Sequence, residues 1–236
     1  MIVVDFLTTD RQVYENSKIV EGVKHIPEWF KNLKPKIFSP VIDGGVGYTM
    51  KTCPGFINLY KQSFMMPLWC DVNLSVAENG SGHASWFTPN NKSKIEAHNE
   101  MQFEGFGGSE WQHLKFDCPW YVKSSKPLDF CFVQPIWNDI DQTKNLRILP
   151  GIVGTQKSQT ISFNVNLMVK REVSHEYYQL EFGIPFVQLL PLTTETIKLK
   201  HHLIDEKEAE YLYSPFSNRQ KFRGAYEALK RKVSGK

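Results

Sequence analysis

The sequence predicts a mainly β protein, built as an antiparallel β-sandwich or a jelly-roll-like barrel. Runs rich in β-branched and aromatic residues recur up to residue 192, and Pro, Gly, Asn and Ser separate them at intervals of about 8 to 15 residues. In "TISFNVNLMV" apolar residues alternate with polar ones, which is the pattern of a strand with one buried face. Repeated short strands of this kind are typical of sandwiches and barrels.

The first sixty residues add short helices to this pattern. "MIVVDFL" has the composition of a strand. A helix is expected near 27–34, because Pro27 suits a first helical turn and the apolar residues around it are spaced three and four apart. The glycines of "DGGVG" (43–47) indicate a turn, and a second helix is expected near 54–62, beginning at Pro54.

The segment "FGIPFVQLLPL" closes the series of strands. Gly183 can adopt a positive φ without steric cost, and Pro185 has no N–H for the ladder, so the two residues predict a corner before a last strand. We therefore expect residues 1–192 to form a mainly-β domain with peripheral helices. Residues 193–236 are expected to form a charged, helical or partly ordered C-terminal tail.

Composition excludes several classes of protein. The 28 basic and 25 acidic residues leave a net charge of +3, which is too small to argue for a nucleic-acid partner. The chain has no apolar run of membrane-spanning length and no secretory leader, so we expect a soluble, intracellular protein without a membrane partner. The four cysteines form no C-x-x-C pair and are expected to be buried thiols.

Histidines and carboxylates raise the question of a metal. His98 and Glu100 lie two residues apart, on one face of a strand, and together with His113 they resemble the Fe(II) ligands of a cupin-like enzyme. A second histidine close to the first is missing, so we expect no cofactor and keep Fe(II) as an alternative. His201 and His202 are adjacent and point to opposite sides, which makes a shared metal improbable; exposure to solvent is expected for both.

Polar residues within apolar strands form a second candidate site. A buried amide must find hydrogen-bond partners or cost about 1–3 kcal/mol. We favour the interpretation that these amides bond to one another and to backbone turns. The alternative is that they line a ligand pocket together with the tryptophans. The candidate ligand-binding residues are Trp69, Asp71, Gln102, Trp120, Gln134, Trp137, Asn164 and Gln188.

Several separated segments together resemble one uncharacterised family of bacterial and tailed-phage proteins. The order of the segments carries the resemblance: "IPEWF" (26–30), "TMKTCPGF" (49–56), "MPLWCDV" (66–72), "HNEMQF" (98–103), "LKFDCPWYVKSS" (114–125), "FVQPIWN" (132–138), "LPGIVGT" (149–155), "FNVNLMV" (163–169) and "FGIPFVQLLPL" (182–192). The resemblance implies a compact β-rich domain and no known activity. "PGIVGTQ" and "GIPFVQLLPL" also look similar to segments of the dUTPase-type fold, but that family's water-activating aspartate has no counterpart here.

These observations favour a non-enzymatic, phage-type protein that acts by protein–protein association or self-association, as an accessory or virion component. The resemblance to phage proteins implies a location in the cytoplasm of the host cell or in a virion. Two alternatives stay open. One is a cupin-like Fe(II)-dependent enzyme that uses His98, Glu100 and His113. The other is a small-molecule or nucleotide-binding β module with the tryptophan- and glutamine-lined pocket.

Overall fold

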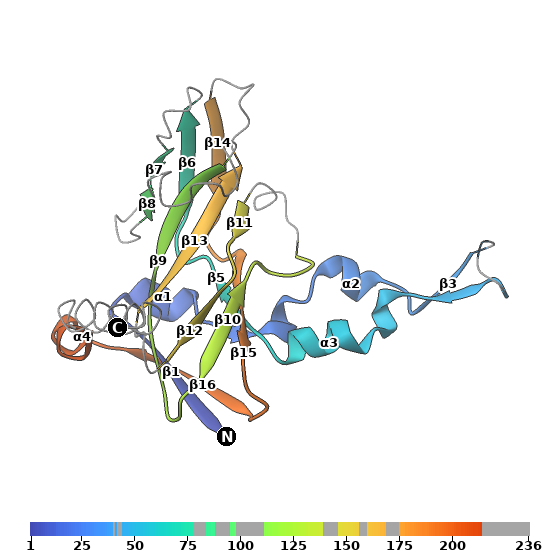
Figure 1. The fold of residues 1–236 in the computed structure, drawn as a ribbon, viewed down its shortest axis with the longest axis horizontal. Coiled ribbons are helices and arrows are strands. Elements are labelled where there is room, and N and C mark those ends of the chain that lie inside the picture. Colours follow the sequence, from blue (N-terminus) through green and yellow to red (C-terminus); the bar gives the residue numbers. More distant parts are fainter. Residues whose placement is uncertain are drawn as a thin grey trace, which may run out of the picture.

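The computed structural model describes residues 1–39, 41, 44–77, 84–87, 95–97, 111–138, 146–155, 160–168 and 175–213. The fold is mainly β, as predicted, with two large sheets, a smaller three-stranded sheet and a separate two-stranded hairpin (Figure 1). The described strands form open sheets and no closed barrel.

Two sheets make up the body. The first has the order β11–β13–β9–β1–β16, with β8 also paired to β9; the strands are β11 (Leu146–Ile148), β13 (Thr160–Met168), β9 (Trp111–Ser124), β1 (Ile2–Thr8), β16 (Ile197–Leu203) and β8 (Ile95–Ala97). The second has the order β12–β10–β15–β5–β2; the strands are β12 (Gly151–Gly154), β10 (Asp129–Val133), β15 (Pro185–Pro191), β5 (Phe64–Pro67) and β2 (Val20–Glu21).

The two sheets pack against each other through one apolar core. Residues of both sheets belong to this core, and the rings of Phe116 on β9 and Phe186 on β15 meet across it with centroids 5.4 Å apart. Side chains on the inner faces are almost completely buried, as those of Val4 and Val187 show. The arrangement is sandwich-like, because period-2 alternation gives each sheet an apolar inner face and here each sheet covers that of the other.

One strand pairing was not expected. Residues 197–203, which the sequence assigned to the tail, form β16 and pair in parallel with β1, whereas the other pairings in the described sheets are antiparallel. Ile197, Leu199 and His201 face inward in β16, and the lysines between them face outward. Helix follows only after this strand, in α4 (Glu206–Tyr213).

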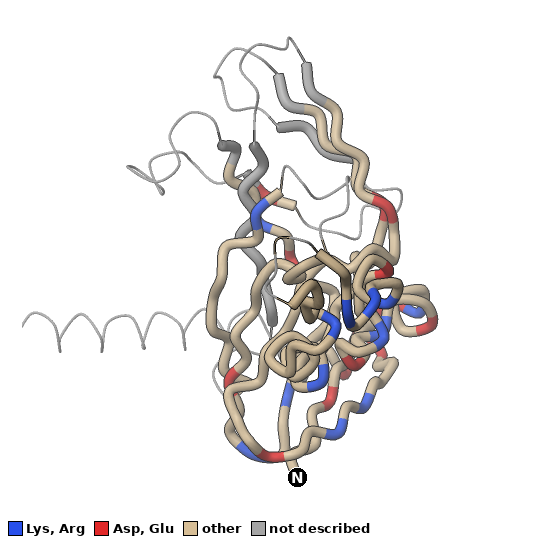
Figure 2. The backbone as a smooth tube through the Cα atoms, turned by 90° about the vertical axis from the view of Figure 1, so that its right-hand side faces the viewer, with Lys and Arg blue, Asp and Glu red and all other residues tan. Residues whose placement is uncertain are grey.

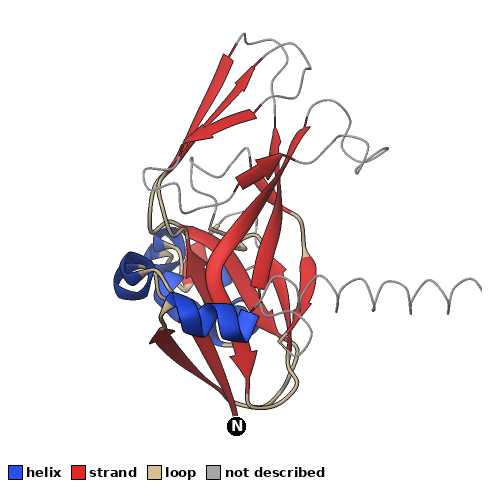
Figure 3. Cartoon of the chain, turned by 90° about the vertical axis from the view of Figure 1, so that its left-hand side faces the viewer, coloured by secondary structure: helices blue, strands red, loops and turns tan. Residues whose placement is uncertain are grey.

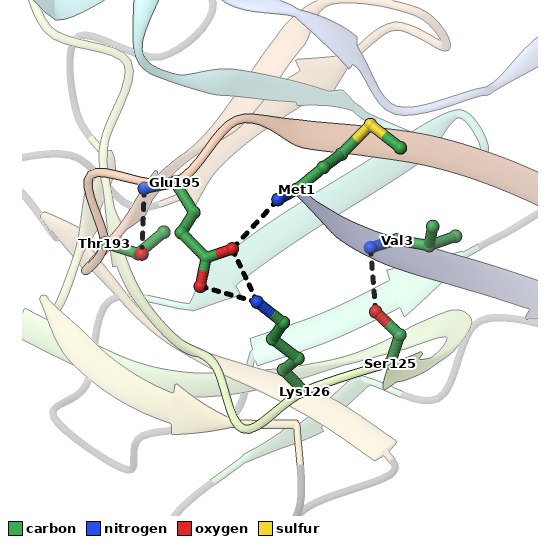
Figure 4. Close-up of polar contacts among 6 residues, drawn as sticks. All are labelled: Met1, Val3, Ser125, Lys126, Thr193 and Glu195. Atoms are coloured by element: carbon green, nitrogen blue, oxygen red, sulfur yellow. Dashed lines mark hydrogen bonds and ion pairs between the residues drawn. The ribbon is translucent and has the colours of Figure 1, made fainter.

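Polar contacts join β16 to the start of β1. The α-amino group of Met1 lies 2.9 Å from Glu195 Oε2, and Lys126 Nζ lies 2.7 Å from the same oxygen (Figure 4). The ammonium of Lys126, followed by that of Met1, lowers the pKa of Glu195. Val3 N also donates to Ser125 Oγ at 3.0 Å, so the turns before β10 and β16 are both tied to β1.

The corner at Gly183 has the predicted geometry. Gly183 has a φ of 84°, and its N–H donates to Leu68 O at 2.8 Å, while β15 begins two residues later at Pro185. The chain therefore turns from β14 (His175–Leu180) in the three-stranded sheet into β15 in the body. The other strands of that small sheet are β6 (Val72–Ala77) and β7 (Ala84–Phe87), which extend away from the helices (Figure 3).

The helices are short. α1 (Arg11–Asn16) begins after Asp10, whose carboxylate accepts hydrogen bonds from two helical N–H groups. The two predicted helices are present as α2 (Glu28–Asn32) and α3 (Pro54–Lys61). Among the described residues, no helix is both long enough and apolar enough to span a bilayer.

Candidate functional site: a projecting hairpin arm

Residues 22–62 leave the body as one extension, which we call the arm (Figure 1). It contains η1 (Gly22–His25), α2, β3 (Lys36–Phe38), β4 (Val46–Tyr48), η2 (Met50–Thr52) and α3. The chain enters and leaves the arm at one point, where Gly22 N donates to Ser63 O at 2.8 Å. Gly22 is required there, because a Cβ at this position would lie 2.7 Å from the carbonyl oxygen of Tyr60.

An aromatic cluster forms the base of the arm. Phe30 of α2 stacks on Phe56 of α3 with ring centroids 4.0 Å apart, and Phe56 stacks on Tyr60 at 5.1 Å. Phe56 and Tyr60 share one helical face because they are four residues apart, and Pro54 starts that helix at its first position. The three rings are buried, so α2 and α3 are held together as one unit.

Hydrogen bonds that are buried or partly buried join this base to the body. Tyr60 Oη donates to Ile136 O, and Ile136 N donates to Oε1 of Gln188 at 3.0 Å. Gln188 Nε2 donates to Ser63 Oγ at 2.9 Å, and the Gln188 side chain is fully buried in β15. Burial raises the pKa of Tyr60 to about 12, so the phenol remains a hydrogen-bond donor at neutral pH.

The neck between base and hairpin is held by Lys51 and Thr49. Lys51 Nζ donates to Phe30 O at 3.0 Å and to Lys31 O at 2.9 Å, which satisfies carbonyls at the C-terminal end of α2. Thr49 N donates to Pro35 O at 3.1 Å, and its hydroxyl donates to Lys34 O. The hairpin therefore starts from a fixed platform.

Beyond the neck, the chain forms a two-stranded hairpin. Lys36 is paired with Tyr48 and Phe38 with Val46, in antiparallel register. Directly paired residues lie on the same face, so Phe38, Val46 and Tyr48 form one apolar surface, which we call the hairpin face. Gly44 and Gly45 in the turn have φ values of 78° and 70°, as the glycine-rich "DGGVG" predicted.

The hairpin face is uncovered. Phe38 is 80% exposed, Tyr48 72% and Val46 52%, whereas comparable side chains in the sandwich core are almost completely buried. The arm carries further exposed apolar side chains: Val23, Trp29, Ile37, Val41 and Met50. Exposed large apolar side chains gathered on one element in this way are typical of interaction sites.

Trp137 extends the apolar surface at the base of the arm. It is half-exposed, and its carbonyl accepts a hydrogen bond from Trp29 Nε1 at 2.9 Å. Its φ of 62° lies in the left-handed region, which is unusual for a bulky residue, so the surrounding contacts hold a strained backbone in place. The Trp137 ring also lies 6.2 Å from that of Phe56.

The arm also differs from the body in charge. Residues 22–62 contain six lysines and two carboxylates, a net charge of +4. Residues 1–21 and 63–213 contain 15 basic and 22 acidic residues, a net charge of −7, and the last 23 residues carry +6. Figure 2, which faces the end of the molecule that bears the arm, shows lysine positions on it in blue.

The tryptophans proposed for a ligand pocket lie in different places. Trp69 and Trp120 belong to the sandwich core: the ring of Trp69 meets Phe186 edge-on at 5.7 Å, and Trp120 Nε1 donates to Ser17 O at 3.2 Å. Trp137 lies instead at the base of the arm. The structure therefore does not bring the three tryptophans together.

The proposed polar ligands are dispersed as well. Asp71 Oδ1 accepts from Phe182 N at 2.7 Å and so fixes the corner before β15. Gln188 is bonded to Ser63 and Ile136, and Gln134 lies half-buried in the turn after β10. Asn164 lies on β13 opposite Lys115, with its side chain outside the described part of the structure, and Gln102 lies outside it altogether.

Of the three residues proposed as cupin-like iron ligands, one lies within the described residues. His98 and Glu100 lie outside the described residues, whereas His113 is buried on β9, opposite Asn166 of β13. Within the described ranges, no three His, Cys, Asp or Glu side chains are grouped so that they could hold a metal ion.

Sequence reasoning missed the hairpin face. It identified the turn at 43–47 but not the apolar residues on both sides of it, Ile37 and Phe38 before and Val46 and Tyr48 after. Two such runs around a Gly-Gly turn are a hairpin signal that could have identified the element.

Comparison of the chain with protein-family models, with curated proteins and with solved structures finds no match.

Proposed function

We propose that this protein is non-enzymatic and acts by protein–protein association, as an accessory or virion component of a phage, with the arm as its docking element. The observation that supports this proposal is the uncovered hairpin face, formed by Phe38, Val46 and Tyr48 and carried outside the body by a fixed base.

The contacts within the hairpin contribute little to its own stability. An isolated two-stranded hairpin is marginal in water, because it has no second layer to cover its apolar side chains. A partner surface would supply that layer. A whole aromatic side chain covers about 150–250 Å², so the exposed fractions of Phe38, Tyr48, Trp29 and Trp137 amount to about 500 Å². A standard interface buries about 800 Å² on each partner.

The partner that we propose is a second copy of this chain. The arm carries +4 and residues 1–21 and 63–213 carry −7, while the +6 of the last 23 residues follows α4, so the arm of one copy is attracted to the acidic part of the body of another. Apolar burial then supplies affinity, and the opposite charges select the arm-to-body orientation over other contacts.

Sedimentation velocity over a range of protein concentrations tests this proposal. The wild-type chain is expected to self-associate. The variant Phe38→Ser/Tyr48→Ser removes two largely exposed rings, each worth about 1.5–3 kcal/mol when buried, so its dissociation constant should rise at least about 100-fold.

Tyr177→Ser is the matched control for the change Tyr48→Ser. Tyr177 is 77% exposed on β14 of the small sheet, against 72% for Tyr48 on the arm, so the same chemical change is made at similar exposure on another surface. This control should associate like the wild type. A wild-type chain that stays monomeric at all concentrations, or equal weakening by both changes, contradicts the proposal.

A further inference from the structure

The charges on the arm disfavour one mode of self-association. Lys34 is exposed in the neck and Lys36 is exposed on the hairpin. Lys36 lies on the hairpin face, with its ammonium 5.4 Å from the ring centre of Tyr48. A two-fold pairing of two hairpin faces would bring like charges together and leave the acidic body uninvolved. The arm is therefore better matched to a different surface on the second copy.

The acidic residues of the body are densest around α4. Asp205, Glu206, Glu208 and Glu210 lie within six positions of one another, and Lys207 is the one basic residue among them. The side chains of Asp205, Glu206 and Glu208 are exposed. Leu203, the last residue of β16 and two positions before Asp205, is 37% exposed and adds apolar surface.

This acidic segment is fixed to the body. Ile204 N donates to Thr8 O at 3.0 Å, and Ile204 and Ala209 pack with Leu7 and Tyr121. α4 lies at the opposite end of the long axis of the molecule from the hairpin (Figure 1). A contact between the arm of one copy and the α4 end of another would join two different surfaces and would leave one arm and one α4 end free.

We infer that the hairpin face docks on the α4 end of the next copy, so that the chain assembles head to tail into a ring or a filament. This inference rests on the proposed self-association and adds the receptor surface to it. The basic arm and the acidic α4 end form the contact, with Phe38 and Tyr48 packed over Leu203.

A charge-exchange experiment tests the pairing. Lys34→Glu/Lys36→Glu makes the hairpin acidic, and Glu206→Lys/Glu208→Lys makes the α4 end basic. Each variant alone places like charges at every contact and should associate at least about tenfold more weakly than the wild type. An equimolar mixture restores an opposite-charge pair at every contact and should assemble again, as measured by sedimentation velocity.

A neutral variant controls for the stability of α4. Lysines in the first turn of a helix oppose its dipole, so Glu206→Lys/Glu208→Lys can fray α4 itself. Glu206→Gln/Glu208→Gln avoids this effect and should still weaken association several-fold. Circular dichroism of each variant should match that of the wild type.

The outcomes separate this inference from the proposed function. If the mixture stays dissociated while Phe38→Ser/Tyr48→Ser still weakens the wild type, the arm mediates association but α4 is not its receptor. If the basic residues after position 213 neutralise α4 instead, the α4 variants assemble like the wild type and the inference is likewise overturned. A monomeric wild type overturns both proposals.

Discussion

Gln188 links the arm to the body, and the change Gln188→Met tests this link. Methionine has a similar volume but cannot accept from Ile136 N or donate to Ser63 Oγ, the two hydrogen bonds that the fully buried amide makes at 3.0 and 2.9 Å. Ser63 keeps its hydroxyl contact with Tyr60 O, so the main loss is the Ile136 N–H left without its acceptor. A buried donor in that position costs about 1–3 kcal/mol, and the lost second bond adds about 1 kcal/mol.

Urea denaturation followed by tryptophan fluorescence measures this cost. We expect Gln188→Met to lower the free energy of unfolding by about 2–4 kcal/mol. Gln134→Met makes the same chemical change at a half-buried position outside the strands and should cost less than about 0.5 kcal/mol. A Gln188→Met variant as stable as the wild type would refute the assignment of Gln188 as the structural link and would reopen its assignment to a ligand pocket.

Two further predictions concern glycine and histidine positions. Gly183→Ala should destabilise the protein by about 1–2 kcal/mol in urea denaturation, because a residue with a Cβ is strained at a φ of 84°. Gly55→Ala in α3 should instead stabilise the protein by about 0.5–1 kcal/mol, because a Cβ there meets only Cys53 Sγ, at 3.8 Å. If Gly183→Ala and Gly55→Ala changed the free energy of unfolding equally, the left-handed conformation of Gly183 at the corner would be contradicted. Burial of His201 against Phe6 and Trp120, followed by the charge of Lys18, lowers its pKa below 6.5. The unfolded chain then binds more protons, so this group makes stability fall as the pH drops below about 6.5. His201→Phe should reduce the difference in urea midpoint between pH 7.5 and pH 5, and an unchanged difference would refute the assignment.

The strands of the sandwich could be predicted because their signal is local. The strand at "TISFNVNLMV" and the Gly183–Pro185 corner each follow from neighbouring residues, and the structure has β13 and the positive φ of Gly183 at these places. The burial of the β13 side chains lies outside the described part of the structure. β16 was missed because Lys198, Lys200 and His202 on its outer face gave the segment the composition of a charged tail. Its inner face, with Ile197 and Leu199, nevertheless keeps the period of two.

The candidate site was harder to predict because it depends on contacts between distant residues. Gln188 bonds to Ser63, 125 residues away, and to Ile136, 52 residues away, and no local pattern in the sequence indicates either partner. The hairpin face could not be predicted for a different reason. Residues such as Phe38 and Tyr48 normally indicate a buried core, so their exposure becomes visible only in three dimensions. The same reasoning explains why Trp69 and Trp120, proposed as ligand contacts, lie in the core.

Hydrogen–deuterium exchange of the hairpin at low and high protein concentration tests the central claim most directly. In dilute protein the amides of residues 36–48 should exchange fast, because a lone hairpin is marginally stable. At concentrations where the chain associates, the same amides should become protected, while those of the edge strand β12 keep their rate. Hairpin amides that exchange equally at both concentrations, in a sample whose mass shows association, would mean that the arm is not the surface through which copies meet.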